Sequence, residues 1–367
     1  MDQDPTAALP DPGMVPQQVA LQKMVDAFAA KGIRLHIDAG SRFSATFNPA
    51  LFNLGGGNVA GSIPYAPCTS IPNALPTAST QLPGCSNFYA HKNGNFDVRR
   101  RPIFHYNLFA NSQLTTGLVG SSGYAEIVGN DSMLTMGHWG FTTGTAQAIN
   151  LLNNMQAGTL MHEFGHNLGL QHGGFESINN YKPNYLSIMN YMYQLQGLPG
   201  SVNTSSAYDR YKYYVDGRNN TPRSSCTLSN SACGASTGFI IDYSNGTSAA
   251  LDEANLFESS VIGRGALSTS DYADWNLSGT LTPLAYALDL NGDGSLAVLK
   301  DYNDWANIVL PFARNFAGAN SGVSNAATAT RRANPMRDHD KRFEVEEAPH
   351  PQLLRELRDA ALPGFRR

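Results

Sequence analysis

Apolar positions in the first half of the chain predict one helix and several strands. Residues 16–31 carry apolar side chains at the spacing of one helix face, Leu21, Met24, Val25 and Phe28, and Gly32 ends the pattern. Alternation of apolar and polar residues predicts strands at 33–37, 103–109, 123–128 and 132–136. A helix followed by strands favours a mixed α/β arrangement for this part of the chain.

Residues 162–172, His-Glu-Phe-Gly-His-Asn-Leu-Gly-Leu-Gln-His, contain three histidines at metal-ligand spacing. On a helix, His162 and His166 lie about 40° apart around the axis and about 6 Å apart along it, so both can reach one ion. A continuing helix would carry His172 away from that ion. Gly169 allows the left-handed conformation that ends helices, so the chain can turn and bring His172 back. The spacing predicts three imidazole ligands and one open coordination position.

The residue types favour zinc and hydrolysis. Three neutral histidines leave a fourth zinc position for water, whose pKa falls to roughly 7. Glu163 directly follows the first ligand and can take the proton of this water and return it to a leaving amine. We therefore expect Glu163 to be the general base and acid.

The eleven-residue pattern resembles the signature of the metzincin zinc endopeptidases, which is followed by a methionine-containing turn. Ser187-Ile188-Met189-Asn190-Tyr191 matches that turn, seventeen residues beyond the third histidine at Met189. The resemblance implies that Met189 forms an apolar floor beneath the ligands and that Tyr191 stabilises the oxyanion. Flanking segments such as Ile241-Asp242-Tyr243-Ser244 are similar to predicted secreted bacterial metzincin-like proteases.

The same resemblance implies an α+β metzincin-like zincin fold with two lobes. The upper lobe should contain a twisted sheet and the active-site helix, and the lower lobe should be irregular. In this clan an edge strand pairs antiparallel with extended substrate, and Gly123–Val128 precedes the active-site helix as that strand should. The expected divisions are an N-terminal segment that could be truncated (1–15), a catalytic domain (16–315, split into 16–172 and 173–315, with an insertion at 194–237) and a largely disordered tail in which a short helix could form (316–367).

Composition excludes several classes of protein. The chain has 367 residues, of which 42% are hydrophobic and 15% charged, so it can bury a full core. A net charge of −4 argues against nucleic acid as the main partner. No apolar stretch approaches the roughly 20 residues of a membrane span. We expect a monomer that acts on proteins or peptides.

The four cysteines fall into two close pairs, Cys68 with Cys85 and Cys226 with Cys233. Closure of each short loop favours a disulfide within each pair, although four cysteines allow three connectivities. Disulfides indicate an oxidising compartment, so we expect a secreted protein.

Other polar residues suggest further metals. Asp289, Asn291 and Asp293 place oxygen atoms at alternate positions before Gly294, as calcium loops do. Lys300 stands where an EF-hand has glutamate, so Asp301, Asp304 or Asp274 would have to complete the site, and an ion-free acidic turn is the alternative. His105 and His138 could bind a second metal, but isolated histidines are more often hydrogen-bonded structural residues.

These features predict a secreted zinc-dependent endopeptidase with zinc and, at the acidic loop, calcium as cofactors. Two alternatives stay open at this point. One is a non-catalytic peptide-binding protein stabilised by zinc and calcium, in which Glu163 would have no duty. The other is a latent protease that requires processing at either end of the chain.

Overall fold

The computed structural model describes residues 11–39, 42, 63–70, 82–97, 100–101, 103–175, 179–198, 234–258, 272–309 and 343–344. The chain forms two compact units. The first contains the described residues up to Thr142, together with Glu163–Gly169, Val309 and Phe343–Glu344. The second contains the described residues of Thr143–His162 and Leu170–Ile308.

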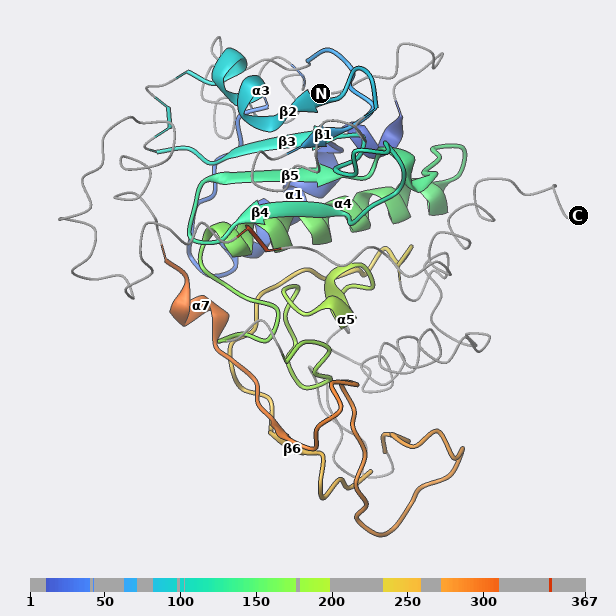
Figure 1. Cartoon of the computed structure of the whole chain (residues 1–367). Helices are drawn as coiled ribbons and strands as arrows, with labels where there is room; N and C mark the ends of the chain where they lie inside the picture. Colours follow the sequence, from blue (N-terminus) through green and yellow to red (C-terminus); the bar gives the residue numbers. More distant parts are fainter. Residues whose placement is uncertain are drawn as a thin grey trace, which may run out of the picture. The chain divides into compact units, whose positions relative to one another are not determined.

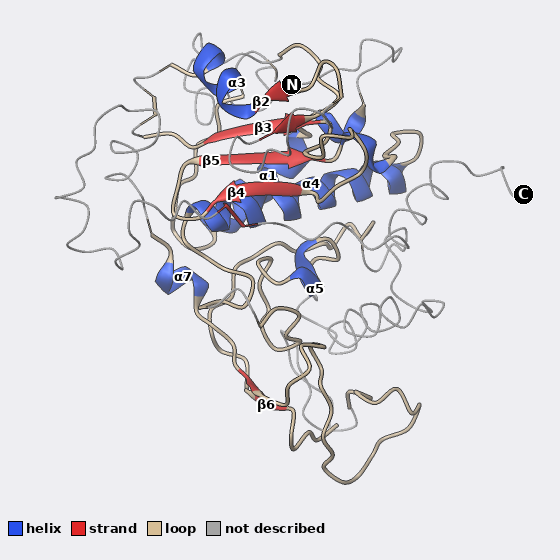
Figure 2. Ribbon diagram, in the orientation of Figure 1, coloured by secondary structure: helices blue, strands red, loops and turns tan. Residues whose placement is uncertain are grey.

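A four-stranded mixed sheet forms the centre of the first unit (Figures 1 and 2). Its order is β3-β5-β4-β8, with the bounds Tyr106–Ala110, Asp131–Thr135, Gly123–Glu126 and Phe343–Glu344. β3 runs parallel to β5, whereas β4 is antiparallel to both β5 and β8. Buried residues of these strands, including Leu108, Met133 and Leu134, supply much of the core. The mixed sheet agrees with the expected α+β class.

Shorter elements complete the first unit. They are the 3-10 helices η1 (Pro12–Met14) and η4 (Gly137–Trp139), the helices α1 (Gln18–Ala29) and α3 (Phe88–Asn95), and the strands β1 (Thr69–Ser70) and β2 (Ser86–Asn87). The apolar face predicted for α1 is buried, because Leu21, Met24, Val25 and Phe28 are each at most 6% exposed. A disulfide joins Cys68 to Cys85, as their spacing predicts, beside the parallel β1–β2 pair. Cys226 and Cys233 lie outside the described residues.

The strand predicted at 33–37 is wrong. Residues 33–39 have no regular secondary structure, and Ile33 is 36% exposed. Alternation alone does not make a strand, since a strand also needs a neighbour to receive its hydrogen bonds. The other three strands are present, with β3 beginning at Tyr106 instead of residue 103.

Helix α4 (Ala146–Asn167) carries the histidine motif. Thr145 caps its start, because its hydroxyl accepts the backbone N–H of Ala148 at 3.1 Å. Every residue from Leu151 to Met161 is buried, including the polar Asn153, Asn154, Gln156 and Thr159, so the helix is enclosed around its whole circumference here. Such all-round burial is typical of a helix inside a protein core.

The second unit contains little regular structure besides the first part of α4. Its elements are α5 (Tyr191–Gln194), β6 (Leu251–Asp252), β7 (Val298–Leu299) and α7 (Asp304–Asn307). β6 and β7 pair antiparallel. Buried side chains including Tyr193, Trp275 and Leu290 form a core beside them. Most of the predicted insertion at 194–237 lies outside the described residues, as does the predicted tail apart from β8. Within the described part of the chain, no helix is both long and apolar enough to cross a membrane.

Candidate metal centre

The end of α4 is set by a glycine turn. The amide of Gly169 donates to the carbonyl of His166 at 2.9 Å, and Gly169 has a φ of 90°. That left-handed conformation disfavours any residue with a Cβ. The chain therefore leaves the helix axis where the motif places its glycine.

A second tight turn holds His172. The amide of Gly174 donates to the carbonyl of Gln171 at 3.0 Å, and Gly174 has a φ of 88°. A Cβ on Gly174 would lie 2.4 Å from the Cβ of Tyr302, so both conformation and space require glycine here. His172, which lies between Gly169 and Gly174, is only 4% exposed.

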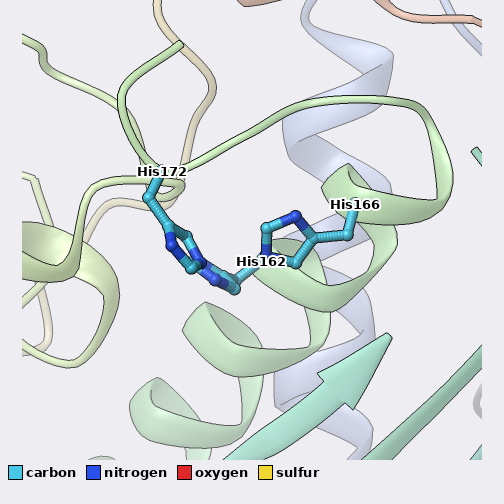
Figure 3. Close-up of side chains that lie close together, drawn as sticks. All are labelled: His162, His166 and His172. Carbon is cyan, nitrogen blue, oxygen red and sulfur yellow. The ribbon is translucent and has the colours of Figure 1, made fainter. Parts of the chain in front are cut away.

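The three histidines lie together. His162 and His166 are fully buried, and one ring nitrogen of each histidine lies within 4.8 Å of those of the other two. Figure 3 shows His162 and His166 on the helix and His172 reaching them from the following loop. Ligand nitrogens around a tetrahedral zinc ion are about 3.3 Å apart. The ring nitrogens of the three histidines, all within 4.8 Å of one another, are therefore close enough to share one ion.

The hydrogen bond of His162 suits a zinc ligand. Its Nδ1 lies 2.8 Å from the carbonyl oxygen of Ile188, which can only accept. Nδ1 must therefore carry the proton, which places the lone pair on Nε2. A donor set of three buried imidazoles, with one tautomer set by the backbone, fits a zinc ion.

That carbonyl belongs to a tight turn at residues 187–190. The amide of Asn190 donates to the carbonyl of Ser187 at 3.1 Å, and the amide of Met189 donates to the hydroxyl of Ser187 at 3.1 Å. The amide of Ile188 donates to the carbonyl of Asp242 at 2.9 Å. Met189 is fully buried. This turn is the segment that the sequence identifies as a methionine turn.

The side chain of Asn190 organises the segment around this turn. Its amide nitrogen donates to the carbonyls of Lys182 at 2.6 Å and Tyr185 at 3.0 Å, and its oxygen accepts the amide of Met192 at 3.1 Å. Asn190 is fully buried and caps the start of α5, whose first residue is Tyr191. The sequence pattern predicts Asn190 only as a member of the turn and carries no signal for its bonds to the carbonyls of Lys182 and Tyr185.

Tyr191 packs against the histidines. The centroid of its ring lies 4.2 Å from that of His172 and 5.7 Å from that of His162. The amide of Tyr191 donates to the side-chain oxygen of Asn180 at 3.1 Å. The ring of Tyr191, the predicted oxyanion residue, thus lies beside two of the three histidines.

Glu163 is fully buried and contacts strand β4. A Cβ built on Gly123, the first residue of β4, would lie 2.2 Å from Oε1 of Glu163 and 2.7 Å from both Cγ and Cδ. The backbone of Gly123 does not have a positive φ, so space alone requires glycine at this position. Periodicity along the sequence has no signal for this contact, because it joins residues forty positions apart.

The last turn of α4 is bonded to the segment that follows β4. The amides of Val128 and Gly129 donate to the carbonyls of His166 and Asn167 at 2.9 and 3.1 Å. The side-chain nitrogen of Asn167 donates to the carbonyls of Glu126 and Asp131 at 2.8 and 2.9 Å. The first two bonds satisfy carbonyl groups that a helix C-terminus leaves without intrahelical partners, and the side chain of Asn167 ties the helix end to both neighbouring strands.

His105 also contacts the last turn of α4. Its Nδ1 lies 3.2 Å from the side-chain oxygen of Asn167, and its ring packs edge-on against Phe164 with centroids 4.8 Å apart. Burial lowers the pKa of His105 to about 4, and the hydrogen bond to Asn167 offsets part of that effect. His138 is exposed. Among the described residues, only the three histidines of the motif form a metal-binding group of three or more His, Cys, Asp or Glu.

The acidic loop at 289–295 closes on its own backbone. Asp289 accepts the amides of Gly292, Asp293 and Gly294 at 2.6–3.2 Å, and Asp293 accepts the amide and hydroxyl of Ser295. The buried Glu253 accepts the amides of Leu290 and Ala297 at 2.6 and 2.9 Å. The carboxylates expected to complete a calcium site bond elsewhere: Asp301 and Asp304 to Ser244, and Asp274 to Ser278 and Gly279.

Comparison with known families agrees with this site. Residues 111–225, about a third of the chain, match the family described as Peptidase M66. The matched range includes β4, β5, all of α4, the three histidines and the 187–190 turn. The chain carries an M66 metallopeptidase segment. This segment is the metzincin-type metalloendopeptidase that the motif implies, and its three buried histidines are those expected of a zinc peptidase in M66. Neither the curated proteins nor the solved structures contain a match to the chain.

Proposed function

We propose that this M66 peptidase cleaves peptide bonds with zinc held by His162, His166 and His172 and with Glu163 as general base and acid. The observation that carries the proposal is the buried cluster of three histidine ligand atoms, with Glu163 next to the first of them on α4. A metalloprotease needs such a carboxylate to move protons, since the histidines are committed to the metal.

Each residue has a distinct task in this proposal. A zinc ion, when bound, supplies a Lewis acid that polarises the scissile carbonyl and makes water acidic near neutral pH. Glu163 accepts a proton from the attacking water at its carboxylate and returns that proton to the leaving amine. Tyr191 donates its hydroxyl to the oxyanion, which the packing of its ring against His172 supports. Met189 provides the apolar floor of the site, and its complete burial supports this role.

Strand β4 is our proposed substrate-pairing strand. Its first residue, Gly123, contacts the Glu163 side chain, so a peptide aligned with this strand passes close to the proposed base. Extended peptides bind by adding a strand to an exposed sheet edge. The strand and the active-site helix fit the upper lobe of a zincin. We therefore propose that the catalytic domain has the two-lobed zincin fold.

Secretion is part of the proposal. The Cys68–Cys85 disulfide supports it, because disulfides persist in oxidising compartments. Calcium at Asp289, Asn291 and Asp293 stays a prediction. The tight turn through Gly292 and Gly294, which both have positive φ, supports this prediction. The carboxylate of Asp289, however, already accepts backbone amides of the loop.

Glu163→Gln tests the mechanism, because the amide keeps the size of the side chain and removes its basicity. The zinc-loaded protein is incubated with a mixed peptide library, with and without a chelator. We expect cleavage by the wild type that the chelator abolishes, and loss of nearly all turnover in Glu163→Gln with zinc content unchanged. Asp26→Asn, an exposed change on α1, is the matched control and should retain activity. Full activity in Glu163→Gln would refute the role of Glu163.

The same experiment addresses the two alternatives. A non-catalytic binding protein would retain library peptides without cutting them, in the wild type and in Glu163→Gln alike. A latent protease would be inert until its sheet edge is freed. One observation, the strand pairing of β8 on β4, favours this second alternative.

A further inference from the structure

The outer edge of the proposed substrate strand is already paired. In the sheet order β3-β5-β4-β8, one side of β4 bonds to β5 and the other side to β8. The β8 pairing is antiparallel, with Ala125 opposite Glu344 and Glu126 opposite Phe343. β8 lies more than two hundred residues beyond β4 in the sequence, so a segment near the C-terminus has returned to this edge.

This pairing lies near the proposed general base. Gly123 touches Glu163, and Ala125 and Glu126 follow it by two and three residues on the same strand. At about 3.4 Å per residue, the β8 pairing begins about 7 Å along β4 from the contact with Glu163. β8 therefore occupies the part of the edge that an extended substrate would use to align its scissile bond.

Two strands cannot bond to the same side of β4 at once. Each backbone N–H and C=O on the outer side of a strand has one neighbouring strand as its partner. The antiparallel direction of β8 is also the direction expected of substrate in this proposal. The sequence Phe343-Glu344-Val345-Glu346 alternates apolar and acidic residues, a pattern that favours an added strand.

We infer that the edge of β4 is a strand-docking surface that the protein's own segment at Phe343–Glu344 fills in competition with extended peptide substrates. This inference rests on the proposed function. The segment acts as an internal competitor, so its occupancy raises the apparent KM without altering the chemistry. If it covers the edge for nine tenths of the time, freeing the edge should lower KM about tenfold.

The test uses the full chain with Phe343→Pro and Glu344→Pro together. Proline has no backbone N–H and breaks strand pairing. We expect kcat/KM to rise by about fivefold or more, with most of the change in KM. Ala327→Pro, a proline placed elsewhere in the same C-terminal region, is the matched control and should leave KM unchanged. An unchanged KM in the double variant would overturn the inference.

A measurement independent of activity separates the inference from the proposed function. Hydrogen exchange of the β4 amides is compared between Glu163→Gln and the same chain with both prolines. Faster exchange is expected in the proline chain, and a synthetic peptide of residues 341–348 should slow it again. Equal exchange rates would refute the pairing. Faster exchange in a protein that never cleaves peptides would retain the pairing and refute the peptidase proposal.

Discussion

Gly123→Ala tests whether β4 positions the proposed general base. The new methyl group would lie 2.2 Å from Oε1 of Glu163 and 2.7 Å from its Cγ and Cδ. Carbon atoms pack without repulsion at about 3.5–4.0 Å, so the carboxylate or the strand must move by about 1 Å. Glu163 is fully buried and has little space for such a movement.

The size of the effect follows from this overlap. Overpacking of a filled interior costs about 1–3 kcal/mol of unfolding free energy. A displacement of about 1 Å in a reacting group costs roughly a hundredfold in rate. Because the change moves the base without touching a histidine, kcat should fall about a hundredfold, whereas zinc content should be unchanged and KM should change much less.

The assay measures kcat, KM, zinc content and thermal unfolding for four proteins and one control variant. These are the wild type, Gly123→Ala, Glu163→Ala and the double variant. Gly144→Ala is the control, because a Cβ there meets nothing within 4 Å and the backbone does not have a positive φ. Replacing Glu163 with alanine removes the three atoms that lie closest to the new methyl group, so the stability cost of Gly123→Ala should largely disappear in the double variant. A cost that persists without the Glu163 side chain, or unchanged kcat in Gly123→Ala, would refute the positioning role.

Three further predictions concern stability and metal. Burial lowers the pKa of His105 to about 4 in the folded protein, against about 6.5 in the unfolded chain. The contribution of neutral His105 to the free energy of unfolding is therefore complete above pH 6.5, and below that pH it is lost by up to about 1.4 kcal/mol per pH unit. The wild type should therefore lose more unfolding free energy than His105→Gln when urea denaturation is measured at pH 4 instead of pH 6.5. A difference in unfolding free energy between the two proteins that stays constant over this pH range would contradict the prediction. Removing the Cys68–Cys85 disulfide, whose cysteines are 17 positions apart, should cost about 3 kcal/mol of unfolding free energy, and an unchanged urea midpoint would argue against it. If the 289–293 loop binds calcium, millimolar Ca²⁺ should raise the Tm of the wild type but not of Asp289→Asn, and equal shifts would exclude the loop.

Local patterns predicted the parts of the molecule that depend on near neighbours in sequence. The apolar spacing of α1, the glycine turn that ends α4, and the closure of the Cys68–Cys85 loop all involve residues within about twenty positions of one another. The strand predicted at 33–37 failed because its alternation said nothing about a pairing partner.

The residue pattern alone predicted the chemistry of the centre, because His162, Glu163 and His166 at helical spacing, followed by a glycine and a third histidine, have few other uses. How that centre is held and covered became visible in the folded chain alone. The carbonyl of Ile188 sets the tautomer of His162, Gly123 makes room for Glu163, and β8 pairs with the edge of β4. Each of these contacts joins residues at least 26 positions apart, where no local period or propensity relates the two partners.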